Sequence, residues 1–205
     1  MEKKLKRVKK ITQDLAIVED RLGKKIDPLI FKTVIWLNVF GINTEGSCAG
    51  HKRWGLPWPW IEIGAKNRPK EEWEGEKKAF KKAAKENNVS YNKLIRGEPD
   101  DLFWKVIAEI IKNPKTDEYI KWEKNTTELL KCLKILLNDF YKKRKVPKII
   151  KLRVVDSRLQ SFNLPNEADY AGWSSKRRSQ LRYLNKRRKE MRDFAKYLEG
   201  RHYND

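Results

Sequence analysis

Hydrophobic residues recur at every third or fourth position over most of the chain, which is the pattern of amphipathic helices. In the first segment these positions are Leu5, Val8, Ile11, Leu15, Val18 and Leu22. The glycine at position 23 favours the end of that helix. The pattern therefore predicts an N-terminal helix within residues 1–23, with a cluster of basic residues at its start.

A second helix is predicted after Asp27 and Pro28, which are a favourable N-cap and first-turn pair. Residues 29–40 are apolar on nearly every side, and Gly41 favours the end of the helix. A helix that is apolar all round has to be covered by other elements. We therefore expect this helix to be the buried centre of the fold.

Four more helices are predicted from hydrophobic spacing and from the prolines and polar residues at their ends. They cover residues 69–86, 99–113, 117–144 and 175–198. In the third of these, Cys132 borders the apolar face. We expect it to be a small core residue rather than a metal ligand.

Four short strands complete the expected secondary structure. Alternating residues predict strands over 42–46 and 60–63, on either side of a loop. Two further strands are expected over 149–155 and 158–164, with a turn between them. The elements together favour an α+β fold, mostly helical, in which a small antiparallel sheet packs against helices. We expect three parts: a basic helix at 1–23, a core domain at 24–164, and a basic helical extension at 165–205.

The loop between the first two strands holds Ser47, Cys48, Gly50 and His51, with one of the two cysteines and one of the two histidines of the chain. An imidazole near a thiol favours the thiolate, so Cys48 and His51 could act as a nucleophile and its base. Glu62 is the candidate third member of this catalytic set, since it shares a sheet face with Trp60. The alternative is structural: Cys48 packs under the loop and His51 satisfies a backbone carbonyl.

The loop carries a resemblance to a known group of sequences. Its residues are Gly41-Ile42, Thr44, Ser47-Cys48, Gly50-His51, Gly55-Leu56-Pro57 and Pro59-Trp60, with later blocks at Phe140-Tyr141, Lys145-Val146-Pro147 and Arg158-Leu159-Gln160. They resemble an uncharacterised family of candidate-phylum bacteria and phages, and this resemblance implies a fold unit but no reaction. The Ser-Cys-x-Gly segment is also locally similar to wybutosine-forming tRNA methyltransferases of archaea. There an arginine usually follows the glycine, and His51 departs from that pattern.

The charge of the chain changes the functional picture. Forty-eight basic residues against 28 acidic ones give a net charge of +20 and a pI near 9.9. Such an excess favours a polyanionic partner, and nucleic acid is the commonest one. The alternative is a generally lysine-rich composition that makes every surface basic. Between residues 176 and 201, eleven basic residues oppose three acidic ones, and several form a stripe opposite the apolar face of the last helix.

We therefore expect a nucleic-acid-binding protein, with RNA favoured over DNA. Trp54 is the candidate platform for an unpaired base, with cations beside it for phosphates. The candidate nucleic-acid-binding residues are Lys52, Arg53, Trp54, Arg177, Arg178, Arg182, Lys186, Arg187 and Lys189. The alternatives are a small enzyme at the Cys48 loop, with RNA modification as one option for its reaction, and a protein-interaction module built on the heptad-like N-terminal helix.

Other classes have no support in the sequence. It contains no P-loop, GxGxxG, HExxH or GxSxG motif, so nucleotide hydrolysis and dinucleotide redox chemistry are not expected. Two cysteines make neither a disulfide framework nor a four-ligand zinc site, and we expect no metal and no cofactor. No apolar run has the ~20 residues that a membrane span requires, so a cytoplasmic location is expected. The oligomeric state stays open.

Overall fold

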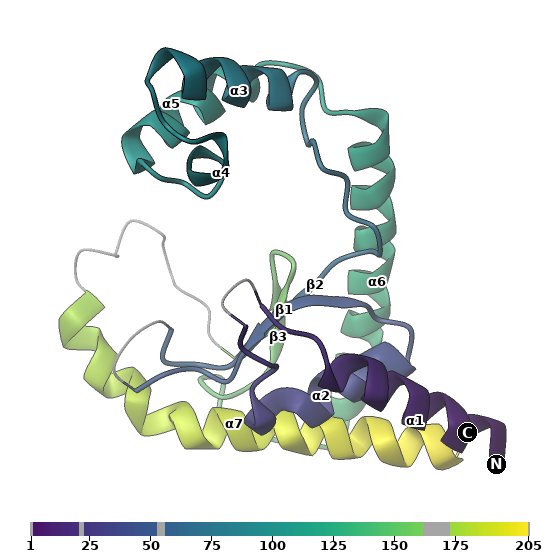
Figure 1. The fold of residues 1–205 in the computed structure, drawn as a ribbon. Coiled ribbons are helices and arrows are strands. Elements are labelled where there is room, and N and C mark those ends of the chain that lie inside the picture. Colours follow the sequence, from purple (N-terminus) through teal and green to yellow (C-terminus); the bar gives the residue numbers. More distant parts are fainter. Residues whose placement is uncertain (1, 21–22, 53–55, 162–172, 205) are drawn as a thin grey trace. The chain divides into compact units, whose positions relative to one another are not determined.

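The computed structural model describes residues 2–20, 23–52, 56–161 and 173–204, and side chains of the last segment only from residue 181 (Figure 1). The helices are α1 (Glu2–Ala16), α2 (Pro28–Val39), α3 (Glu76–Glu86), α4 (Tyr91–Leu94), α5 (Asp100–Ile110), α6 (Asp117–Tyr141) and α7 (Trp173–Asn204). The strands are β1 (Thr44–Cys48), β2 (Trp60–Ile63), β3 (Arg153–Val155) and β4 (Arg158–Gln160). The expected α+β class, mostly helical with one small antiparallel sheet, is confirmed.

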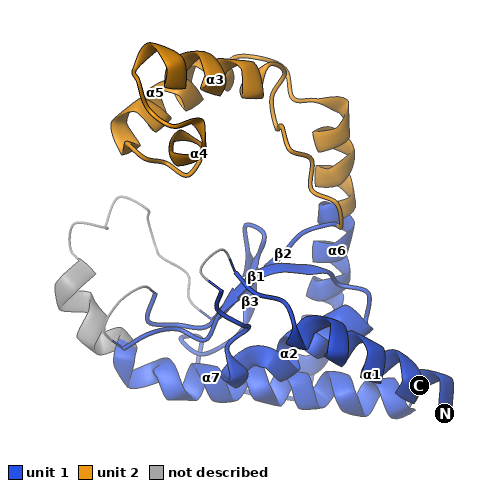
Figure 2. Ribbon diagram, viewed as in Figure 1, with its two compact units in different colours: residues 1–65, 126–205 blue, residues 66–125 orange. Residues whose placement is uncertain are grey.

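The chain forms two compact units (Figure 2). Unit 1 comprises residues 1–65 and 126–205, and unit 2 comprises residues 66–125. The division differs from the three parts expected from the sequence. Both terminal helices belong to the same unit as the sheet, because the all-round apolar helix α2 packs against α1, α7 and β1.

The sheet belongs to unit 1 and has the strand order β1-β2-β4-β3, with every neighbouring pair antiparallel. Ile61 pairs with Leu159, and both side chains are buried on the face that meets the helices. Trp60 pairs with Cys48 on one side and with Gln160 on the other, on the opposite face. The register shifts between Thr44 and Gly46, and the alternation predicted for β1 is broken there.

Helix α2 is the buried centre of unit 1, as its composition predicted. The Asp27 carboxylate accepts a hydrogen bond from the Leu29 backbone N–H at 2.9 Å and caps its start. Buried Thr33 donates from Oγ1 to the Met191 carbonyl at 3.1 Å, which ties α2 to α7. The core around it contains Ile30, Val34, Leu37, Ile42, Ile61, Leu133, Leu159, Met191, Phe194 and Leu198.

Several predicted boundaries are wrong: β1 is Thr44–Cys48 rather than 42–46, β3 begins at Arg153 rather than 149, and α7 continues to Asn204 rather than ending at 198. Two further helix boundaries differ for a local reason. Helix α1 ends at Ala16, because the following chain forms a β-bridge between Glu19 and Lys25. Helix α3 begins at Glu76 rather than near residue 69. The Glu76 carboxylate accepts hydrogen bonds from the Glu72 and Trp73 backbone N–H groups, at 2.6 and 3.2 Å, which holds the preceding segment in a turn.

Cys132 is exposed, so its predicted place in the core is wrong. Helix α6 turns Leu133, Leu136 and Phe140 into the core, and position 132 falls outside that stripe.

Unit 2 has a small core of its own, formed by Phe80, Ala84, Leu94, Val106 and Ile110 of helices α3, α4 and α5. Among the described residues of either unit, no helix has both the length and the apolarity that crossing a bilayer would require.

The start of α1 and the end of α7 meet in unit 1. Lys4 donates from Nζ to the His202 carbonyl at 2.9 Å, and the His202 ring lies 5.6 Å from that of Trp36. The His202 Nε2 is buried and has no hydrogen-bond partner among the described residues. Burial, together with the charges of Lys4 and Arg7, lowers the pKa of His202 below its usual value.

Acidification is therefore expected to destabilise this contact. The unfolded chain binds a proton at His202 with the ordinary pKa of about 6.5, whereas the folded chain binds it less readily. The free energy of unfolding should decrease as the pH falls below about 6.5 and should be insensitive to this group above it. Urea titrations of the wild type and His202→Gln between about pH 5 and 8 measure the effect. His51→Gln is the matched control and should keep the dependence; parallel curves for wild type and His202→Gln would show that His202 is not responsible.

Candidate functional site

The loop that the sequence singled out begins at Cys48, the last residue of β1. The half-buried Cys48 Sγ accepts a hydrogen bond from the Gly50 backbone N–H at 3.3 Å. The His51 backbone N–H donates to the Leu56 carbonyl at 2.9 Å. These two bonds make the start of the loop a tight, internally bonded bend.

Gly50 is required at this bend for two reasons. Its φ is +79°, a conformation that side chains other than glycine rarely adopt. A Cβ atom there would also lie 2.7 and 2.8 Å from the Trp58 carbonyl carbon and oxygen, and 2.9 Å from Leu184 Cδ1. The loop thus packs tightly between the segment at Trp58, which leads into β2, and helix α7.

Arg188 of α7 binds the loop through two backbone carbonyls. Its Nε donates to the Ala49 carbonyl at 2.8 Å, and its NH2 nitrogen donates to the Gly50 carbonyl at 2.6 Å. Arg188 was not among the candidate site residues, because it lies inside a run of basic residues. Its position on the helix is the signal that could have found it. At about 100° per residue it lies at the border of the apolar face, where a long side chain can reach a neighbouring element.

The surroundings of Cys48 do not favour a thiolate. Burial is the main influence and raises the pKa of the Cys48 thiol, and the negative charge of Asp27 acts in the same direction. The hydrogen bond from Gly50 and the positive charge of Arg188 oppose this rise without overcoming it. The direction is opposite to the one that a nucleophilic Cys48–His51 pair requires.

Glu62 lies on the outer face of the sheet, with Trp60, as its strand position predicted. Its carboxylate forms an ion pair with Arg158 at 3.3 Å, and the Arg158 guanidinium lies 4.6 Å from the centre of the Trp60 ring. The geometry gives Glu62 a structural partner on strand β4. Its place in a catalytic set with His51 stays a prediction.

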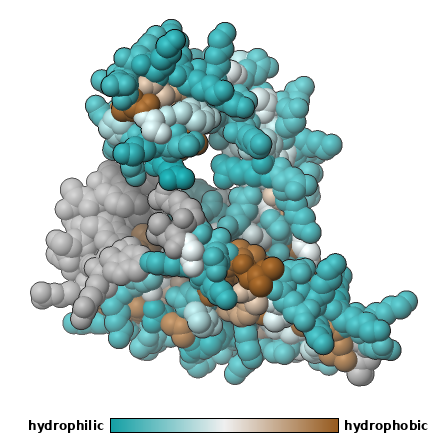
Figure 3. All heavy atoms as spheres, viewed as in Figure 1, coloured by the Kyte–Doolittle hydropathy of each residue, from teal (hydrophilic) through white to brown (hydrophobic). Residues whose placement is uncertain are grey.

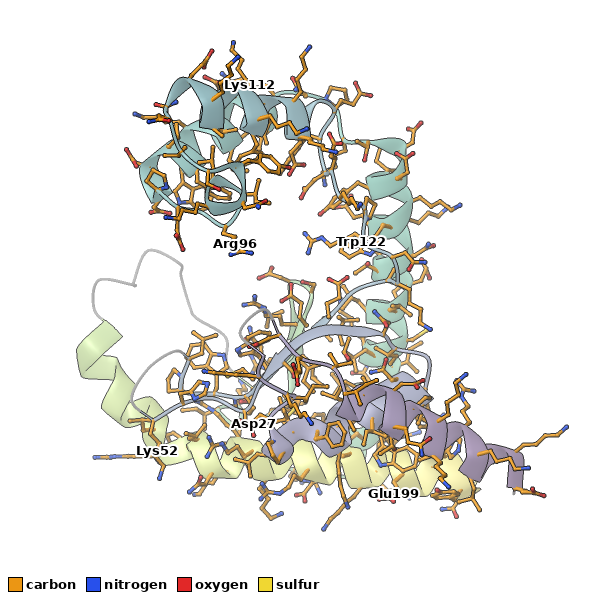
Figure 4. The ribbon with its side chains drawn as sticks, in the orientation of Figure 1. Asp27, Lys52, Arg96, Lys112, Trp122 and Glu199 are labelled. Carbon is orange, nitrogen blue, oxygen red and sulfur yellow. The ribbon has the colours of Figure 1, made fainter. Side chains whose placement is uncertain are left out.

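The tryptophans of this region have different environments. Trp58 is buried and donates from Nε1 to Gln160 Oε1 at 3.1 Å, so it is part of the packing. Lys52 is exposed and extends away from the ribbon (Figure 4). Arg53 and Trp54, two of the candidate nucleic-acid-binding residues, lie outside the described residues.

Helix α7 presents a basic stripe to solvent. Arg182, Lys186 and Lys189 are all exposed, at spacings of four and three that place them on one side of the helix. Lys196 extends the stripe and Arg192 flanks it; both are exposed, and neither was among the candidate site residues. The side chains of Arg177 and Arg178 lie outside the described part of α7.

The structure corrects the prediction that Arg187 binds nucleic acid, because this residue does not lie on the protein surface. Its side chain is 0% exposed and donates from Nε to the Ile149 carbonyl at 3.1 Å. Burial lowers the pKa of Arg187 to about 10. The residue follows Leu184 by three positions and precedes Met191 by four, so the helix places it on the buried face.

A polar network holds α7 in this orientation. The buried Glu190 carboxylate accepts hydrogen bonds from the Tyr141 hydroxyl and from Arg144, each at 3.0 Å. The Tyr141 oxygen in turn accepts from the Leu152 backbone N–H at 2.8 Å. On the stripe itself, Lys189 pairs with Asp193 at 2.6 Å, and such an exposed pair contributes little to stability.

The two units share the charge unequally. Unit 1 contains 33 Lys and Arg against 16 Asp and Glu, a net charge of +17, whereas unit 2 contains 15 against 12, a net charge of +3. Among the residues that the structure describes, no group of three or more His, Cys, Asp and Glu side chains could hold a metal ion. In comparisons with known proteins, no family model, no curated protein and no solved structure matches this chain.

Proposed function

We propose that this protein binds nucleic acid, RNA in preference to DNA, and that the exposed basic stripe of α7 contacts the phosphates. The observation that carries the proposal is the stripe itself. Arg182, Lys186 and Lys196 are exposed and have no ion-pair partner among the described residues, while the opposite side of the helix is buried. Four turns of helix from residue 182 to residue 196 extend about 20 Å, enough to meet several phosphates.

The anchoring of α7 adds to this argument. Its orientation is fixed by the hydrophobic core and by the Glu190 network, so the cationic side chains start from a rigid backbone. Little backbone entropy is then lost on binding, which favours affinity. Phosphate contacts release counterions, so binding should weaken steeply as salt is added.

Replacing Arg182, Lys186, Arg192 and Lys196 together with glutamine tests the proposal. We expect weaker binding of an RNA hairpin and a slope of log K against log salt that is lower by about three to four, since each lost phosphate contact removes about 0.9. Fluorescence anisotropy between about 50 and 200 mM salt measures both quantities, and the same hairpin in DNA tests the preference for RNA. The fold should persist, because all four side chains are exposed.

The matched control removes four exposed lysines from another part of unit 1: Lys134, Lys142, Lys143 and Lys145. This variant has the same net charge and should lose much less affinity. Equal losses in the two variants would assign binding to net charge and not to α7. Binding that does not respond to salt would reject phosphate contacts as its basis, and no binding at low salt would reject nucleic-acid binding altogether.

The enzyme alternative has less support, since burial raises the pKa of the Cys48 thiol.

A further inference from the structure

Unit 2 has a basic surface that is separate from α7. Five of the eleven residues of helix α3 are lysines, and all five are exposed: Lys77, Lys78, Lys81, Lys82 and Lys85. The opposite side of the helix buries Phe80 and Ala84. Lys82 forms a long ion pair with Glu86 at 3.8 Å, and the other four have no ion-pair partner among the described residues.

An aromatic cavity of about 560 Å³ adjoins this lysine face. Its walls include Trp73, Tyr91, Phe103 and Trp104, and Lys77 belongs to both the cavity and the lysine face. Trp104 is 59% exposed, a high value for so large an aromatic side chain. Figure 3 shows a small hydrophobic patch on unit 2 amid a mainly hydrophilic surface.

The acidic residues of the cavity wall are engaged within unit 2. The Glu76 carboxylate accepts hydrogen bonds from the Glu72 and Trp73 backbone N–H groups. Glu71 Oε2 accepts from the Lys77 backbone N–H at 3.2 Å, and the Glu72 carboxylate lies 3.9 Å from Lys115 Nζ. Of the five α3 lysines, only Lys77 lines the cavity, beside Lys70. The surface complementary to an anion is the lysine face of α3 itself, where four of the five ammonium groups have no ion-pair partner among the described residues.

We propose that unit 2 contains a second binding site, for single-stranded nucleic acid. The α3 lysines hold successive phosphates, and an unpaired base enters the aromatic cavity and stacks on Trp104. Aromatic rings beside a row of cations are the arrangement that binds single strands, because every base has a face that can stack. The class of ligand rests on the proposed function, whereas the location rests on unit 2 alone.

The charges distinguish this occupant from an apolar peptide. A peptide helix docked in the cavity would place an apolar face beside uncompensated ammonium groups and gain nothing from them. A nucleotide satisfies both features, since its base is flat and apolar on its faces and its phosphate is anionic. The helix geometry supports the pairing, because Lys77, Lys81 and Lys85 lie four residues apart and so follow one line along α3.

Trp104→Ala in the full chain tests the site, with a 12-nucleotide single-stranded RNA and an RNA hairpin as probes. We expect single-strand binding to weaken roughly 5- to 150-fold, the range for losing one stacked base, and hairpin binding to be unchanged. Trp104→Phe keeps a ring for stacking and should restore most of the affinity. Ile111→Ala removes another exposed apolar side chain just beyond α5 and should have no effect. Circular dichroism verifies that each variant is folded.

A second variant replaces Lys77, Lys81 and Lys85 together with glutamine. For the single strand, the slope of log K against log salt should fall by about two, since each lost phosphate contact removes about 0.7. Unchanged single-strand binding by Trp104→Ala overturns the second site, even if the α7 variant loses hairpin binding, and then the proposed function stands alone. A different outcome would separate the two proposals the other way. If Trp104→Ala loses single-strand binding while the α7 variant binds the hairpin normally, the α7 surface is rejected and the site in unit 2 is supported. Equal loss of both probes in Trp104→Ala also overturns the second site.

Discussion

Gly50→Ala is expected to lower the free energy of unfolding of unit 1 by roughly 2–5 kcal/mol. Two costs combine: the left-handed backbone conformation costs a side chain about 1–2 kcal/mol, and overpacking typically costs about 1–3 kcal/mol. The new methyl group would meet the Trp58 carbonyl group, which cannot move without shifting the chain that leads into β2. Urea unfolding followed by circular dichroism measures the change.

Gly41→Ala is the matched control for this substitution. Gly41 has a φ of +80°, nearly the same as Gly50, but a Cβ atom there has no neighbour within 4 Å. Its replacement should cost only the conformational part, about 1–2 kcal/mol. Equal losses at the two positions would mean that the contact with Trp58 and Leu184 relaxes without cost, and would contradict the tight packing of the loop.

Arg188→Met is expected to be the second most damaging single change, with a loss of roughly 2–4 kcal/mol. It keeps an unbranched apolar stem but leaves the Ala49 and Gly50 carbonyls without their charged donors. The half-buried Cys48 should then become more accessible. Loss of the Arg188 charge also removes an influence that lowers the Cys48 pKa, which by itself would slow alkylation. We expect the gain in access to be the larger effect, so that in a Cys132→Ser background the rate of Cys48 alkylation under native conditions rises.

Lys186→Met is the control for Arg188→Met, since it removes a positive charge from an exposed position two residues earlier. Its effect on stability should stay within about 0.5 kcal/mol, as for most surface changes. An alkylation rate that is unchanged in Arg188→Met would show that the loop keeps its conformation without the arginine.

The basic run in α7 shows how far the sequence could predict the site. Four consecutive residues have four environments: Lys186 is exposed, Arg187 is buried, Arg188 binds the loop and Lys189 pairs with Asp193. Composition treats them alike, whereas helical periodicity distinguishes Lys186 from Arg187. Periodicity places Arg188 at the border of the apolar face, but it does not identify the partners, the Ala49 and Gly50 carbonyls of a segment 138 residues away.

The fold was more predictable than the site. The all-round apolar pattern of α2 and the alternation in β2 predicted their burial, because hydrophobic burial follows local periodicity. The early end of α1 depends on a β-bridge, and the late start of α3 depends on the hydrogen bonds of the Glu76 carboxylate. Both are specific pairings that helix propensity does not encode. Pairing also gave Glu62 its partner Arg158, 96 residues along the chain.

The interrupted path of the chain through unit 1 has a consequence for biosynthesis. Residues 1–65 leave the ribosome before unit 2, but the part of α6 from residue 126, the β3–β4 hairpin and α7, which complete their core, are made only after unit 2. At about 5–20 residues per second, roughly 7–30 s pass between the synthesis of α2 and that of α7. Unit 2 is continuous and can fold during that interval, whereas the most apolar helix of the protein has α1 and β1 beside it but still lacks α7. The nascent chain is therefore most prone to aggregation, and most in need of a chaperone, while unit 2 is being made.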